Sequence, residues 1–291
     1  MLNPDISKGL VKAFATFFIY ALLQNQVFAC EPPQNCAKQG EWDVGIAFGL
    51  GVRDNPLVDG DTIPNVVLFD IAWYGDTMYF DNGELGFKWH DSDSVLAESY
   101  LTLDRENTFF ELWHPGNFTV NAATPPSPGQ TPLPGDSNFE ISVDDVSTRK
   151  WAINFGSRVH YYFDDYEASF SIETDISSVH QGHKAEISLE RLWKGENWNV
   201  RLRPSVIWKS DNHVNYYYGI SPADTEIEAL FYSAKSGFQP GISLSFTRTI
   251  TPQWYWVANA SYRRLHGSMV DSPLVDKRTI ASFFVGAGYR F

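Results

Sequence analysis

The chain has 291 residues, of which 43% are hydrophobic and 15% aromatic, and its 35 acidic against 22 basic residues leave a net charge of −13. So many aromatic residues exclude wholesale disorder. The lack of any apolar run of about eighteen residues excludes a bundle of membrane-spanning helices. The excess of acidic residues argues against a nucleic-acid-binding protein. A membrane β-barrel remains compatible, because its strands place only alternate residues in lipid.

The first thirty residues have the organisation of an export signal. Lys8 and Lys12 precede an apolar run that is too short to span a bilayer. Val27 and Ala29 then supply the spacing for cleavage after Ala29. We therefore expect residues 1–29 to be a signal peptide that is removed on export.

Both cysteines, Cys30 and Cys36, directly follow the expected cleavage point. In an exported protein they can close a small disulfide ring. Alternatively, cleavage would make Cys30 the first residue, which is the position that carries the lipid in bacterial lipoproteins. Phe28 fits such a signal poorly, so the disulfide is favoured. No histidine is near either cysteine in the sequence, and neither is a candidate catalytic thiol.

From Trp42 onward apolar residues alternate with polar or small ones, which predicts β-strands. The clearest strands are expected over 42–52, 150–163, 166–176, 197–208 and 279–291, although Phe284 breaks the pattern of the last. Weaker alternation predicts strands over 65–74, 84–90, 95–104, 107–114, 183–193, 213–219, 237–249 and 253–265. Because bacterial barrels have even strand numbers, we expect about twelve strands, within a range of about ten to fourteen.

Three features favour a membrane barrel over a soluble β-sandwich. The strands are about ten residues long, which is enough to cross a bilayer at a tilt. The polar faces mix glycine with charges of both signs, which suits a lumen crossed by ion pairs. Aromatic residues stand near the ends of the apolar faces, as in membrane-interface girdles: Trp42, Trp73, Trp89, Trp193, Trp198, Trp208 and Trp254.

The expected fold is therefore all-β, a single antiparallel transmembrane β-barrel of the Gram-negative outer membrane. A periplasmic tail is expected over 30–41 and the barrel over 42–291, with a long Pro-rich loop over 115–149 that is read as a surface insertion. The residues expected to face lipid are Trp151, Phe155, Phe170, Ile172, Val200, Phe283 and Val285. Those expected in the lumen are Arg158, Glu173, Arg201 and Arg290.

Candidate chemistry is sparse. His180 and His183 could form a metal pair, but a third ligand is lacking and a polar turn is favoured. The carboxylate pairs at 144–145 and 164–165 resemble the acidic dyads of outer-membrane proteases, yet both stand where turns are expected. No nucleophile-elbow motif indicates a hydrolase. We therefore predict no catalytic residue, no metal ligand and no cofactor.

The tyrosine cluster at 216–218 could stack a sugar. Alternation directs Tyr216 and Tyr218 outward together with Val214, so a membrane-interface belt is the favoured interpretation. Residues 271–273 are expected to form a loop that caps the barrel mouth.

Several motifs of the second half occur in an order and spacing that resemble one known family. They are residues 216–222 (YYYGISP), 232–237 (YSAKSG), 271–275 (DSPLV) and the closing 288–291 (GYRF). The chain resembles the MipA/OmpV family of MltA-interacting outer-membrane proteins, most strongly from about residue 150. The positions that match the family motifs are Tyr218, Gly219, Ser221, Tyr232, Gly237, Asp271, Ser272, Pro273, Tyr289 and Phe291.

The resemblance implies a non-enzymatic outer-membrane barrel and, in the family's namesake, a scaffold that joins a lytic murein transglycosylase to a murein synthase. Such enzymes and outer-membrane lipid are thus the implied partners. The rival hypothesis is a narrow pore for small solutes, because a barrel of about twelve strands stands between a filled interior and an aqueous channel. An adhesin or an outer-membrane hydrolase comes third. Charged residues of both signs favour a filled lumen: Lys150, Arg158, Glu167, Glu173, Lys184, Glu186, Arg201 and Arg203.

Overall fold

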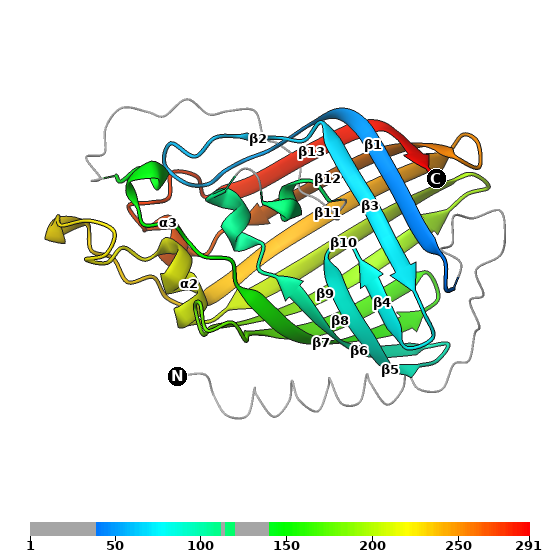
Figure 1. The fold of residues 1–291 in the computed structure, drawn as a ribbon, viewed down its shortest axis with the longest axis horizontal. Coiled ribbons are helices and arrows are strands. Elements are labelled where there is room, and N and C mark those ends of the chain that lie inside the picture. Colours follow the sequence, from blue (N-terminus) through cyan, green and yellow to red (C-terminus); the bar gives the residue numbers. More distant parts are fainter. Residues whose placement is uncertain (1–38, 112–113, 120–139) are drawn as a thin grey trace.

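The computed structural model describes residues 39–111, 114–119 and 140–291, which form a closed β-barrel (Figure 1). Antiparallel pairing runs through the wall from β1 (Trp42–Arg53) to β13 (Thr279–Arg290), and β13 pairs back with β1. Of the 13 strands, β2 (Ile63–Pro64) only pairs with the end of β1, so twelve strands make the closed wall. This confirms the expected fold class and strand number.

The other wall strands mostly follow the predicted ranges, but β4 was missed because it has only four residues. Their bounds are β3 (Val67–Tyr74), β4 (Met78–Asp81), β5 (Glu84–Asp91), β6 (Val95–Leu103), β7 (Ile153–Phe163), β8 (Tyr166–Asp175), β9 (His183–Lys194), β10 (Trp198–Lys209), β11 (Gly237–Thr249) and β12 (Trp254–Arg264).

Two predicted strands are wrong. The 107–114 region contains the 3-10 helix η1 (Glu106–Phe109), and the 213–219 region is the helix α2 (Asp211–Tyr218). In α2 the buried Val214, Tyr217 and Tyr218 follow the spacing of one helical face, which a short window with alternating apolar residues does not distinguish from a strand. Further short helices are η2 (Pro115–Asn117), η3 (Val143–Asp145), η4 (Glu228–Leu230) and α3 (Gly267–Val270). None of the helices in the described part of the chain is long and apolar enough to cross a membrane.

The two ends of the barrel differ. At one end, which we name the turn end, the connections over 75–77, 92–94, 164–165, 195–197 and 250–253 are short, and β1 begins and β13 ends there. The opposite end, named the loop end, carries the long connections over 54–66, 104–152, 176–182, 210–236 and 265–278, and the short turn over 82–83 between β4 and β5 lies on the same side. In outer-membrane barrels short turns lie in the periplasm and long loops outside the cell.

The outer face of the wall is apolar. The residues predicted to face lipid are exposed, apart from Val200, which is half-buried. Trp151 is exposed but precedes β7, in the loop-end connection, where its indole donates to Glu111. Of the predicted lumenal residues, Glu173 is buried and all four are in ion pairs or hydrogen bonds with lumenal partners.

Phe284, the exception to alternation, points inward and is only 1% exposed, packed with Ala47, Leu68 and Tyr255. Gly49 on the neighbouring strand leaves the room for its ring, since a Cβ added there would lie 2.8 Å from the ring and 2.2 Å from the Val285 carbonyl oxygen. The predicted signal peptide, the predicted disulfide between Cys30 and Cys36 and the predicted loop of Pro-rich residues 121–137 lie outside the described residues.

Candidate functional site

Charged side chains cross-link the lumen. Arg158 on β7 contacts both Glu84 and Glu98 at 2.5 Å, and His160 stands 3.3 Å from Glu98 and 2.6 Å from Glu167. Buried charges are tolerated when each one faces an opposite charge. The other lumenal pairs are Lys184–Glu173 at 2.7 Å, Arg203–Glu186 at 3.2 Å, Arg201–Glu190 at 3.4 Å and Arg290–Asp43 at 2.8 Å. Lys150 differs from the prediction, because it precedes β7 and is exposed.

The loop end is closed by a cap, which we define as the described residues of the five long connections (Figure 1). Side chains from four of these connections and the adjoining end of β13 share one apolar core, so the cap is a packed layer and not a set of separate loops. The core consists of Leu57, Phe109, Ile141, Val214, Tyr217, Tyr218, Ile220, Leu230, Ala234, Leu265, Met269, Leu274, Val275 and Ile280.

Three of the four family-like motifs of the second half meet inside this cap. The Ser272 hydroxyl donates to the Tyr218 carbonyl oxygen at 2.6 Å, and the Tyr232 hydroxyl donates to the Ser268 carbonyl oxygen at 2.7 Å. Tyr232 also exchanges backbone hydrogen bonds with Ile220. Three motifs that are separated in the sequence therefore make one cluster.

The remaining motif positions lie at element ends. Gly219 ends α2, Ser221 donates to Asp224 at 2.9 Å, and Gly237 begins β11 against the His266 ring. Asp271 and Pro273 flank Ser272 in the 265–278 connection, and the rings of Tyr289 and Phe291 lie 5.1 Å apart at the turn end.

The predicted membrane-interface belt at 216–218 is wrong. Tyr217 and Tyr218 are fully buried in the cap, and the Tyr216 hydroxyl accepts a hydrogen bond from the Lys150 backbone at 2.7 Å. Helical geometry turns these rings into the loop-end core, whereas alternation had directed two of them to lipid.

A polar layer lies directly beneath the apolar core. Glu106 accepts a hydrogen bond from the Lys209 ammonium group at 2.5 Å and another from the Tyr218 hydroxyl. Burial opposes its charge, but the positive charge of Lys209 lowers the pKa of Glu106 to about 2. Burial and the Glu106 charge both raise the pKa of Tyr218 well above its ordinary value. Glu106 is therefore an ionised acceptor and Tyr218 a neutral donor.

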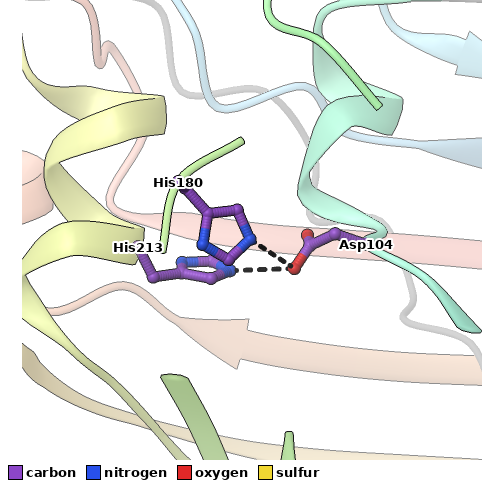
Figure 2. A group of neighbouring side chains, drawn as sticks. All are labelled: Asp104, His180 and His213. Carbon is purple, nitrogen blue, oxygen red and sulfur yellow. Dashed lines mark hydrogen bonds and ion pairs between the residues drawn. The ribbon is translucent and has the colours of Figure 1, made fainter. Parts of the chain in front are cut away.

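The same layer brings together Asp104, His180 and His213 (Figure 2). Asp104 follows β6, His180 lies in the turn before β9, and His213 belongs to α2. The Asp104 Oδ2 atom is 3.0 Å from His213 Nε2 and 3.7 Å from His180 Nε2, and all three side chains are buried. His183, the sequence candidate for pairing with His180, is exposed and lies 3.0 Å from the Thr174 hydroxyl.

Hydrogen bonds and charge hold Asp104 ionised. Its carboxylate also accepts from the Asn154 amide at 2.9 Å and from the Glu106 backbone N–H at 2.8 Å. Burial opposes the charge, but His213 and His180 keep the pKa of Asp104 well below its usual range. Burial lowers the pKa of His213, against the opposing effect of the Asp104 charge.

The three residue types fit a transition metal, because two imidazoles and one carboxylate with ligand atoms within 4.8 Å are a known donor set. The proton positions do not fit. Gly182 donates its backbone N–H to His180 Nδ1 at 2.9 Å, so a neutral His180 carries its proton on Nε2, the atom that faces Asp104. The geometry is therefore that of a carboxylate that accepts a hydrogen bond from His213, with the His180 Nε2 atom facing it from 3.7 Å, beyond hydrogen-bond distance.

This cluster joins three cap segments, over 104–152, 176–182 and 210–236. Within the described residues, neither histidine is hydrogen-bonded to a serine, threonine or cysteine that could act as a nucleophile. Asp144 and Asp145 are exposed on η3 in the cap, whereas Asp164 and Asp165 form the turn between β7 and β8. Of the three residues, the sequence analysis named only His180; it missed Asp104 and His213, because no local spacing links positions 104, 180 and 213.

The comparisons by family model and by related sequences agree on one family. The family model described as MltA-interacting protein MipA matches residues 44–291. The MltA-interacting protein of Escherichia coli K12 is 24% identical over 259 residues, which cover 87% of this chain and 91% of that relative. YiaT of the same organism, named as an outer membrane protein, is 29% identical over 224 residues, 76% of this chain and 80% of that relative. OmpT, an outer membrane protein of Vibrio cholerae, aligns with a TM-score of 0.35 at 8% identity over 86% of this chain and 97% of that one.

Proposed function

Because the chain belongs to the MltA-interacting protein family, we propose that it is a non-enzymatic scaffold that binds enzymes of murein hydrolysis and synthesis at the cell envelope. The protein is a β-barrel of the Gram-negative outer membrane. The name of the relative supports the class of partner. The observation that carries the proposal is the closed interior, in which paired charges cross the lumen and a packed cap covers the loop end.

A dedicated channel requires a continuous polar path with a defined constriction. Here Arg158, Glu84 and Glu98 meet across strands, and the apolar core of the cap lies over one mouth. This arrangement supports binding on an outer surface of the barrel over passage of bulk solute.

The turn end is the surface that we propose for the partner, because murein lies in the periplasm and short turns face that compartment. Four of its five turns expose carboxylates, so a basic surface of the partner would complement it. These residues are Asp76, Asp93, Asp164, Asp165 and Glu196.

The test combines affinity capture with planar-bilayer conductance. Immobilised full-length barrel is incubated with envelope extract, and retained murein transglycosylase is measured by its activity on murein. We expect retention by the wild type and loss after Asp164→Lys with Asp165→Lys at the turn end. The matched control is Asp144→Lys with Asp145→Lys, an exposed acidic pair in the cap.

One outcome would contradict the scaffold, and another would contradict the proposed binding surface. One is large, stable and ion-selective conductance by the pure barrel with no murein enzyme retained, which would establish the narrow pore. The other is equal retention by the turn-end and cap variants, which would remove the turn end as the binding surface.

A further inference from the structure

A polar pocket lies on the surface of the cap, apart from the charged network of the lumen and from the turn end. Its volume is about 460 Å³, which is within the range of about 300–1,000 Å³ for small-molecule sites. Residues 147–150 and 177–179, from two loop-end connections, line it together with Tyr216 of α2. Most of these residues are exposed, so a ligand reaches the pocket from outside the barrel and does not pass through the lumen.

Hydrogen bonds hold the walls of the pocket in place. The Arg149 guanidinium group pairs with Asp224 at 2.7 Å and donates to the Gly219 carbonyl oxygen at 3.2 Å, which ties its segment to the chain that follows α2. The Ser177 hydroxyl accepts from the Ile153 backbone N–H at 3.0 Å, which ties the second segment to the start of β7. The pocket is therefore formed before any ligand binds, which lowers the cost of binding.

One positive charge of the pocket is uncompensated. Lys150 is exposed, and among the described residues no carboxylate oxygen lies within 4.0 Å of its ammonium group. The acidic residues bonded to the pocket walls are engaged elsewhere. Asp224 pairs with Arg149, whereas Asp175 accepts from the Ser177 hydroxyl at 2.6 Å and from two backbone N–H groups. Since no carboxylate belongs to the described lining, an anionic group would meet Lys150 without a competing negative charge.

The rest of the lining combines hydroxyl groups with an aromatic ring. The exposed hydroxyls of Thr148 and Ser178 have no partner in the described part of the chain, and each can donate and accept. The Tyr216 hydroxyl accepts from the Lys150 backbone N–H at 2.7 Å, and the centre of its half-buried ring lies 5.7 Å from the Arg149 guanidinium carbon. A sugar presents hydroxyl groups at its edge and C–H groups on its faces, so this lining matches both parts of a sugar.

We propose that this pocket binds a saccharide unit that carries a carboxylate or phosphate group. Lys150 pairs with the acidic group through a charge-assisted hydrogen bond, and the Tyr216 ring lies against the sugar. Because long loops face the outside of the cell, the saccharide comes either from a soluble glycan or from a glycolipid of the outer leaflet. The site is independent of the scaffold function, which depends on the turn end.

The test is saturation-transfer NMR on the protein in detergent with glucuronate, glucose and acetate, so that the acidic sugar is compared with the sugar alone and the acid alone. We expect the wild type to bind glucuronate more tightly than either. Lys150→Gln should weaken glucuronate binding about fivefold and leave glucose binding unchanged, because it removes one exposed charge pair. The matched control is Lys235→Gln, an exposed lysine of the cap outside the pocket, which should bind like the wild type.

A second variant tests the aromatic contact. Tyr216→Leu should weaken glucuronate and glucose binding alike, because the ring contacts the part that the two sugars share. Its unfolding midpoint is measured in parallel, and Lys150→Gln, which changes an exposed side chain, decides the proposal if Tyr216→Leu does not fold. The proposal is overturned by a wild type that binds acetate as tightly as glucuronate, by a wild type that binds none of the three, or by an equal loss in Lys235→Gln.

A competition experiment identifies the source of the saccharide. Lipopolysaccharide, whose sugars carry carboxylates and phosphates, is added to the protein with bound glucuronate. Displacement of glucuronate supports a glycolipid of the outer leaflet as the ligand, whereas persistence of the glucuronate signal supports a soluble glycan.

Discussion

The lumenal network around Arg158 gives the sharpest test of how this barrel is stabilised. We predict that Arg158→Met destabilises the barrel strongly, although methionine fills a similar volume and removes a charge from the interior. The reason is that Glu84 and Glu98 stay behind without their cation. Removing one partner of a buried ion pair typically costs about 3–5 kcal/mol, whereas an exposed pair contributes about 0–1 kcal/mol.

The structure decides where between these limits the cost falls. Glu98 is only 4% exposed and loses a 2.7 Å hydrogen bond from Arg158 Nε, which leaves it with His160, 3.3 Å away, as a basic neighbour. Glu84 is 17% exposed and Arg158 is 23% exposed, so water reaches that side of the network. We therefore expect a loss of about 3 kcal/mol, at the lower end of the buried range.

The assay is urea unfolding of the barrel in liposomes, followed by tryptophan fluorescence. Adding Glu98→Gln to Arg158→Met should restore part of the lost stability, because it removes the stranded charge. A cost below about 1 kcal/mol for Arg158→Met, with no recovery in the double variant, would show that the lumen is solvated like an outer surface.

Three further outcomes are expected. Phe170→Arg, at a lipid-facing position that is 53% exposed near the middle of β8, should cost about 2–4 kcal/mol by the same assay, whereas an equal cost for Phe170→Leu would speak against a lipid contact. Burial lowers the pKa of His213 from 6.5, so the unfolded chain binds more protons than the folded chain as the pH falls below 6.5. The wild type should therefore lose stability as the pH falls below that value, and hydrogen exchange in α2 should rise more than in His213→Gln. Mass analysis of protein from envelopes should find the chain beginning at or near Cys30, and an intact Met1 would refute the export signal.

The wall of the barrel was predictable because its information is local. In a strand, successive side chains alternate between lipid and lumen, so the two faces can be distinguished within a window of a few residues. Phe155 and Phe170 were assigned to lipid, and Arg158 and Glu173 to the lumen, on this basis alone. Phe284 broke the rule because a glycine on the neighbouring strand made room for an inward ring, and that pairing is not visible in the sequence of β13.

The sequence by itself indicated the two faces of the wall and the family, which depend on local periodicity and on contiguous motifs. It limited the number of strands to between about ten and fourteen, and the rule that bacterial barrels have even strand numbers gave the estimate of about twelve. Only the tertiary structure decided the cap. Residues 211–218 form a helix in the structure, where the sequence had predicted a strand over 213–219. Asp104, His180 and His213, from connections that are distant along the chain, lie together in the structure. These contacts form because strand pairing closes the sheet and brings separate loops to the same mouth, and no local pattern encodes which loop residues meet there.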